Sequence, residues 1–92
     1  MKYVLLGTLD AKWAVKQAER TKAARAQAGK LGLKVEQVCY TQGQYDFVDI
    51  VDAPTPEAML AFSVWYAKQE FGKLQSLPAF DEKAMLAAIE RA

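Results

Sequence analysis

The sequence predicts an α+β domain of the ferredoxin-like type, with helices on one face of a four-stranded antiparallel sheet. Three observations lead to this prediction. The 92 residues are enough for a single domain spanning 1–92. Apolar runs and helical periodicities follow one another in the order βαββαβ, with one further helix at the end. A hairpin in the middle joins two βαβ-type halves, as this fold requires.

The first strand and helix are expected at residues 2–31. Residues 2–9 form an apolar run without polar alternation, typical of a central strand. Asp10 is expected to cap the helix that follows, and Gly32 to end it. The stripe that we expect to pack on the sheet consists of Ala14, Ala18, Thr21, Ala24, Ala28 and Leu31. Arg20 is expected on a solvated face with the other basic residues of this helix.

The central hairpin is expected to pair residues 35–42 with residues 45–53 across a two-residue turn at Gly43 and Gln44. Gly43 should then adopt a positive φ. This register places Tyr40 opposite Phe47, Val38 opposite Asp49 and Glu36 opposite Val51. We expect this aromatic and acidic set to lie on the uncovered face of the sheet. The face expected under the helices carries Val35, Cys39, Val48 and Ile50.

The second helix is expected to start at Pro56 with Thr55 as its N-cap, and Gly72 should end it. More of its circumference is apolar than one sheet-facing stripe requires. The apolar residues are Met59, Leu60, Phe62, Val64, Trp65 and Tyr66.

The last strand is expected at residues 73–80, where Pro78 restricts it to an edge of the sheet. Asp81 should cap a final helix from Glu82 to about Glu90. The apolar side of this helix carries Met85, Leu86 and Ile89.

The absence of histidine and the single cysteine limit the kinds of catalytic and metal site that this chain can form. The chain has no histidine, which removes the commonest general base near neutral pH and the usual haem ligand. Cys39 is the one cysteine and is expected to be a buried apolar residue of a strand. No metal-ligand spacing stands out, so we predict neither a metal site nor a cofactor.

Nucleic acid and membranes are not expected partners. Residues 1–34 carry eight basic and two acidic side chains, but the whole chain has a formal net charge of +1. The basic helix has few aromatic residues between its charges, so a solvated surface explains it better than a phosphate-binding one. No apolar run reaches the length of a membrane span and no signal peptide is evident, which predicts a cytoplasmic location.

The hairpin resembles that of the GYD domain family, with Gly43, Tyr45 and Asp46 at the positions of its motif, followed by residues 47–54. The resemblance extends over nearly the whole chain. It implies a dimeric α+β barrel, a group that includes small cofactor-free monooxygenases and haem-binding relatives, and it implies no particular catalytic residue. For Asp46 we expect an ion pair with Arg25 or Lys30.

Two hypotheses for the function remain. In the first, the protein is a homodimer or larger homo-oligomer, built sheet against sheet, that binds a small, partly aromatic ligand in an inter-sheet cavity. The cavity would be lined by Tyr40, Tyr45, Phe47 and Asp49. In the second, it is a cofactor-independent monooxygenase or isomerase acting on a small aromatic or quinone-like substrate. Asp49, with a pKa raised by desolvation, would be the base, and a tyrosine hydroxyl would stabilise an oxyanion.

Overall fold

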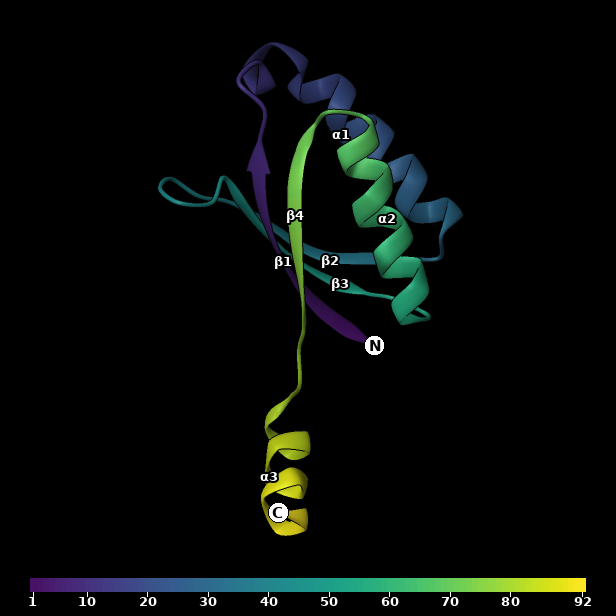
Figure 1. The fold of residues 1–92 in the computed structure, drawn as a ribbon, viewed down its shortest axis with the longest axis vertical. Coiled ribbons are helices and arrows are strands. Elements are labelled where there is room, and N and C mark those ends of the chain that lie inside the picture. The colour runs from purple at the N-terminus through teal and green to yellow at the C-terminus, as the bar shows by residue number, and fades with distance from the viewer.

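The computed structural model describes residues 1–92, apart from the side chain of Trp13. Its elements are β1 (Lys2–Leu9), α1 (Trp13–Lys30), β2 (Lys34–Tyr40), β3 (Phe47–Asp52), α2 (Pro56–Lys68), β4 (Gly72–Pro78) and α3 (Glu82–Arg91). The predicted βαββαβ order with a final helix is confirmed. In Figure 1, α1 and α2 lie together on one face of the sheet, while α3 extends away from it.

The four strands form one antiparallel sheet in the order β2-β3-β1-β4. The two central strands are therefore β1 and β3, and β4 lies at an edge, as Pro78 predicted. This order is the one expected for a ferredoxin-like fold, so the predicted fold class is confirmed. The first βαβ half and the second interleave in the sheet, which places the hairpin strand β3 beside β1.

The predicted register of the hairpin is confirmed at Tyr40, opposite Phe47, and at Val38, opposite Asp49. A bulge between Val35 and Gln37 shifts the register beyond these pairs, so Val35 lies opposite Val51. The predicted pair of Glu36 with Val51 is therefore wrong.

The turn is wider than predicted. The strands end at Tyr40 and resume at Phe47, and residues 41–46 form a loop closed by a 2.9 Å hydrogen bond from Thr41 N–H to the Asp46 carbonyl. Gly43 has a φ of 130°. Its predicted positive φ is confirmed, although the two-residue turn is not.

The face that the helices cover is the opposite of the predicted one. Phe47 and Val51 are buried, at 4% and 1% exposure, and Asp49 shares their side of the strand. Val48 and Ile50 lie on the uncovered face instead. The size of the Phe47 side chain explains why this face is the covered one. Its ring lies over Gly7 of β1 and fills space between the sheet and the helices that the smaller Val48 side chain would leave empty. A Cβ atom at Gly7 would stand 2.0 Å from that ring.

The start of α1 also differs from the prediction. Asp10 Oδ1 accepts a 2.9 Å hydrogen bond from Lys12 N–H, but no side chain caps the helix, whose N-cap is Lys12. Ala14 and Ala18 are exposed, whereas Arg20 is buried at 6% exposure. The buried stripe of α1 is thus rotated toward the face that carries Arg20.

The predicted start of α2 is confirmed, since Thr55 Oγ1 accepts a 3.1 Å hydrogen bond from Ala58 N–H. The helix ends at Lys68, before the predicted Gly72, which instead opens β4 with a φ of 143°. A Cβ atom at Gly72 would lie 1.9 Å from the carbonyl oxygen of Thr8. Gly72 therefore permits the close pairing of β4 with β1.

The capped start of α3 is confirmed as well. Asp81 Oδ1 accepts a 2.8 Å hydrogen bond from Ala84 N–H. None of the residues of α3 is buried. Among the described helices, none is long and apolar enough to cross a membrane.

Candidate functional site

A pocket lies between α1, α2 and the helix-covered face of the sheet. Its volume is about 60 Å³. Most of its lining is apolar and includes Leu5, Ala24, Val38, Val51, Phe62 and Leu74. A few polar side chains converge on it, a combination typical of small-molecule sites. They are Arg20, Thr21, Arg25, Tyr40, Asp49 and Tyr66.

Arg20 brings a buried positive charge to the pocket. Its Nη1 donates a 3.0 Å hydrogen bond to the hydroxyl of Tyr66, and its Nη2 donates a 2.7 Å bond to Gln17 Oε1. The guanidinium carbon lies 5.7 Å from the ring centre of Phe47, within cation–π range. Its Nε is buried without a hydrogen-bond partner, and no carboxylate in the described part of the chain forms an ion pair with it. A buried cation of this kind is a strong attraction for an anionic group.

Asp49 brings a carboxyl group to the same pocket. Its Oδ1 is buried and has no hydrogen-bond partner among the described residues. Burial raises the pKa of Asp49 to about 6, while the charges of Arg20 and Arg25 act in the opposite direction. A raised pKa was predicted, but its cause lies in the packing of this chain rather than in a dimer interface. At neutral pH the carboxyl group is mostly ionised, and its raised pKa makes it a stronger proton acceptor than an ordinary aspartate.

Tyr66 contacts the Arg20 guanidinium in this pocket. It is 2% exposed, and burial raises the pKa of its hydroxyl, partly opposed by the charge of Arg20 and its hydrogen bond. Because the hydroxyl oxygen accepts from Arg20, its own proton is free to be donated. Toward the rim, Gln17 Nε2 donates a 3.0 Å hydrogen bond to the hydroxyl of Tyr40, which is 58% exposed. The polar groups thus run from the surface to the buried end of the pocket.

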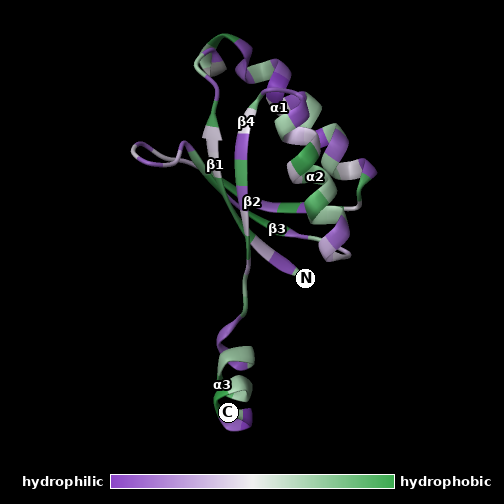
Figure 2. Cartoon of the chain, viewed as in Figure 1, coloured by the Kyte–Doolittle hydropathy of each residue, from purple (hydrophilic) through white to green (hydrophobic). Residues whose placement is uncertain are grey.

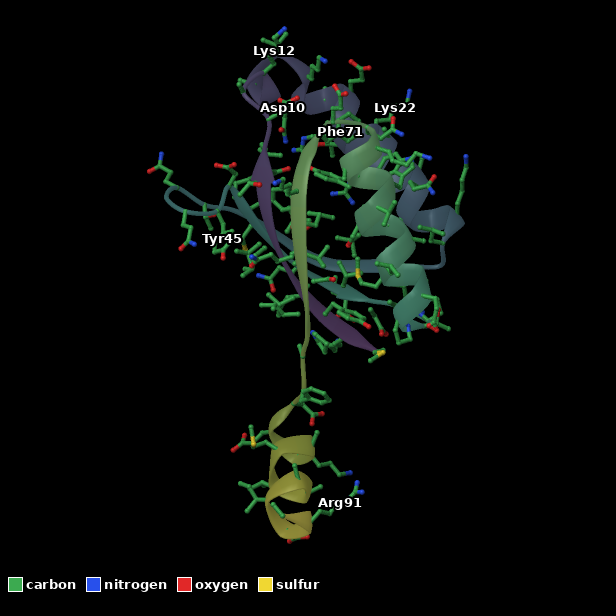
Figure 3. All side chains as sticks on the ribbon, viewed as in Figure 1. Asp10, Lys12, Lys22, Tyr45, Phe71 and Arg91 are labelled. Carbon is green, nitrogen blue, oxygen red and sulfur yellow. The ribbon has the colours of Figure 1, made fainter. Side chains whose placement is uncertain are left out.

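Three of the four predicted ligand-binding residues, Tyr40, Phe47 and Asp49, line this pocket. The pocket lies between sheet and helices, however, and not between two sheets. Tyr45 does not line it. Its hydroxyl donates a 3.1 Å hydrogen bond to Gln75 Oε1 of β4, outside the helix-covered layer (Figure 3).

The motif residue Asp46 has a structural contact that differs from the predicted one. Its Oδ2 accepts a 2.7 Å hydrogen bond from Leu9 N–H, and its own N–H donates a 2.8 Å bond to the carbonyl of Gly7. The predicted ion pair with Arg25 or Lys30 is therefore wrong. A backbone N–H at the end of β1 takes the place of the cation.

The sequence analysis assigned four of the polar pocket residues to no site: Arg20, Thr21, Arg25 and Tyr66. A signal for Arg20 was present, because residues 20, 24, 28 and 31 recur at helical spacing with the small and apolar stripe of α1. A basic side chain on an otherwise small stripe can be buried if it meets a hydroxyl. Tyr66 offered no such signal, since an aromatic residue of α2 fits a core position equally well.

The donor set of the pocket does not suit a metal ion. Among the residues that the structure describes, no three His, Cys, Asp or Glu side chains cluster. The pocket combines one carboxyl group with two guanidinium groups, of Arg20 and Arg25, and with phenol hydroxyls, which suits an organic molecule with acidic oxygens.

Fold and pocket together define a ferredoxin-like α+β protein with a small polar-ended cavity under its helices. The GYD domain model matches residues 3–89, and the chain belongs to this family. No curated protein matches the chain. Among solved structures, it is similar to a 5-chloro-2-hydroxyhydroquinone dehydrochlorinase from Burkholderia phenoliruptrix AC1100, solved in complex with 2,5-dihydroxybenzoquinone. The TM-score is 0.62 at 14% identity, over 91% of this chain and 98% of that one, which shows a shared fold.

Proposed function

We propose that this protein binds a small, partly aromatic ligand with an acidic oxygen in the pocket between its helices and its sheet. One observation carries the proposal: the buried guanidinium of Arg20 has no ion-pair partner and shares a pocket with the unpartnered Oδ1 of Asp49. A ligand with one anionic oxygen and one hydroxyl group satisfies both. The anionic oxygen accepts from Arg20 and Tyr66, and the hydroxyl donates to Asp49.

Aromatic walls favour a ring as the body of this ligand. Phe47, Phe62 and Tyr66 line the pocket. Its volume of about 60 Å³ is below the ~150 Å³ of a cavity that holds benzene, so the pocket excludes a large cofactor and takes a single ring only when its lining side chains move. The structural relative from Burkholderia was solved with 2,5-dihydroxybenzoquinone, a ring with two acidic hydroxyl groups. The identity is only 14%, so the shared fold alone makes that molecule a first probe for binding.

The proposed assembly is a homodimer in which the uncovered faces of two sheets pack together. That face carries apolar side chains at positions that alternate with the pocket residues, namely Val4, Leu6, Cys39, Val48, Ile50 and Leu77. Leu77 and Cys39 are exposed and the other four are half-buried, and an apolar patch of this kind on an uncovered sheet is typical of a protein interface. Dimerisation there would leave the ligand pocket of each copy separate, on the other side of its sheet.

A binding experiment tests the proposal. We expect 2,5-dihydroxybenzoquinone, measured by isothermal titration calorimetry, to bind the native chain, and Arg20→Gln to weaken binding about 10- to 100-fold, because a charge-assisted hydrogen bond is lost. Lys22→Gln is the matched control, since Lys22 is an exposed cation of the same helix. Equal affinity of the two variants would contradict the proposal, provided that urea unfolding shows both to be folded.

A second candidate function is that of a cofactor-independent enzyme acting on the same class of ring. The pKa of about 6 at Asp49 favours it, because a carboxylate with this pKa takes a proton from a hydroxyl or an activated carbon near neutral pH. Arg20 and Tyr66 would then stabilise the negative charge that develops on the ring oxygen. Isomerisation needs only this proton transfer, whereas a monooxygenase reaction would also consume O₂.

Turnover separates the two candidates. We would follow absorbance and O₂ uptake with a panel of phenols and quinones. Turnover that is abolished by Asp49→Asn, while binding is retained, favours the enzyme. Tight binding without turnover across the panel favours the binding module.

A further inference from the structure

Helix α3 exposes an apolar side. Met85, Leu86 and Ile89 are 58%, 58% and 63% exposed, and no residue of the helix is buried. Figure 1 shows α3 beyond the end of the sheet, and Figure 2 shows hydrophobic segments along it. An isolated helix shorter than about 12 residues is only marginally stable in water, and α3 has 10 residues. Its apolar side therefore needs a surface to pack against.

Helix α2 offers a surface of matching character. Its outward side forms a shallow groove lined by Glu57, Leu60, Ala61, Val64, Trp65 and Lys68, which recur at the spacing of one helical stripe. Leu60 and Val64 are 63% and 51% exposed. The apolar centre of this groove is bounded by an acid at the N-terminal end of α2 and by a base at its C-terminal end.

Charge determines the orientation in which α3 fits this groove. Glu82 lies on the same stripe of α3 as Met85, Leu86 and Ile89, at spacings of three, four and seven residues. If α3 runs antiparallel to α2, Glu82 meets Lys68. If it runs parallel, Glu82 meets Glu57 and the two acids repel each other.

The antiparallel orientation requires a second copy of the chain. Ala79 N–H donates a 2.9 Å hydrogen bond to the carbonyl of Lys2, so that only residues 80 and 81 separate the sheet from α3. The chain reverses direction between α2 and β4 (Figure 1). A helix that folded back from the end of β4 onto its own α2 would therefore run parallel to it.

We propose that α3 of one copy packs antiparallel into the α2 groove of a second copy. Each copy offers one α3 and one groove, so the exchange can be reciprocal and close as a symmetric pair. This contact uses neither the ligand pocket nor the uncovered sheet face. It is independent of the proposed ligand.

Disulfide trapping tests the contact and its orientation. With Lys68 set opposite Glu82, Leu60 lies about 12 Å and Ile89 about 10.5 Å along their helices, so these two side chains should meet. In a Cys39→Ser background, the pair Leu60→Cys with Ile89→Cys should give a covalent dimer of twice 10.2 kDa on a non-reducing gel. Leu60→Cys with Ala87→Cys is the matched control, because Ala87 lies on the far side of α3.

Several outcomes would overturn the proposal. One is a disulfide within a single chain, which would place α3 on its own α2. Others are equal trapping by the Ala87 control and stronger trapping by Val64→Cys with Ile89→Cys, the pair that meets in the parallel orientation. No trapping in any pair, together with cosedimentation of the native chain with anionic lipid vesicles, would assign the apolar side of α3 to a membrane surface.

A charge exchange gives an independent measurement. Glu82→Lys should weaken the association seen by sedimentation velocity at least about 3-fold, because Lys68 then faces a like charge. Glu82→Lys combined with Lys68→Glu should restore it. Failure of the second change to restore association would overturn the antiparallel contact.

Discussion

Successive residues of β3 enter two different environments. Phe47, Asp49 and Val51 face the helices, and Val48 and Ile50 face the uncovered side. The covered face holds a charged residue and a hydroxyl network, whereas the uncovered one has an apolar centre around Val48 and Ile50, flanked by polar side chains. The two faces therefore suit two different proposals: the buried polar groups of the covered face suit a ligand pocket, and the apolar centre of the uncovered face suits the proposed dimer interface.

The largest effect on the covered face is expected for Gly7→Ala. A Cβ atom at Gly7 would lie 2.0 Å from the Phe47 ring, and this ring has little freedom to move because it is buried among other aromatic side chains. We expect a loss of about 2–3 kcal/mol in the free energy of unfolding, measured in urea. Gly29→Ala in α1 is the control, because nothing lies within 4 Å of its added Cβ. A loss below about 0.5 kcal/mol would mean that Phe47 does not fill this space.

On the uncovered face, Ile50→Lys should separate the proposed dimer while the fold is kept. A lysine buried between two sheets costs about 3 kcal/mol or more, equivalent to at least about a 100-fold weaker association. Light scattering over a concentration series measures this change. Val15→Lys is the control, since Val15 is 89% exposed on α1. A dimer that tolerates Ile50→Lys would contradict the sheet-to-sheet interface. Phe47→Lys cannot serve as this test, because Phe47 is buried at 4% exposure and the substitution should unfold the chain.

A smaller effect is expected from the charge of Asp49. Because its folded pKa is raised to about 6, the native state binds a proton that the unfolded state has already lost, so stability falls as pH rises from 3.8 to about 6 and then levels off. After allowance for solvent screening the change is about 1–2 kcal/mol. Asp49→Asn should remove it when urea unfolding is followed from pH 4 to pH 7. A pH profile unchanged by this substitution would contradict the burial of the carboxyl group.

The matched control for this pH dependence is Asp52→Asn. The N-terminal ammonium donates a hydrogen bond to Asp52 and lowers its pKa. The contribution of this residue therefore has the opposite sign, since stability is present above the unfolded pKa and is lost as pH falls. The two variants should change the acid side of the profile in opposite directions.

The smallest change in stability is expected for a substitution in the loop that joins β2 and β3. Gly43 has a φ of 130°, which costs a residue with a side chain about 1 kcal/mol or more. Gly43→Val should destabilise the fold by about 1 kcal/mol, because the exposed loop can relax part of the strain. A loss under about 0.5 kcal/mol in urea unfolding would indicate that the positive φ is not required.

Much of the fold could be predicted because local chemistry determines it. Thr55 and Asp81 cap their helices as expected, Pro78 lies on an edge strand, and the pairs of Tyr40 with Phe47 and Val38 with Asp49 follow from the alternation of the hairpin. These features depend on neighbouring residues or on a pattern of period two.

The covered side of the hairpin could not be predicted in this way. The aromatic and acidic residues of the hairpin were expected on the sheet face away from the helices. Asp49 instead lies on the covered face with Phe47 and Val51, because those two side chains fill the space under the helices. The neighbouring strand β1 is apolar on both faces and gave no indication of the side. Arg20 was missed for a similar reason, since its burial depends on Tyr66, a residue 46 positions away.

The hydrogen bond from Leu9 N–H to Asp46 has a kinetic consequence. It joins residues 37 positions apart, with α1, β2 and the hairpin loop between them, so it can form only when these segments have assembled. A contact of such sequence separation is expected to be absent from the folding transition state. Removing it with Asp46→Ala should therefore accelerate unfolding and leave the folding rate nearly unchanged in a stopped-flow chevron. Asp46, the acid of the family motif, would then prolong the lifetime of the native state by slowing its unfolding.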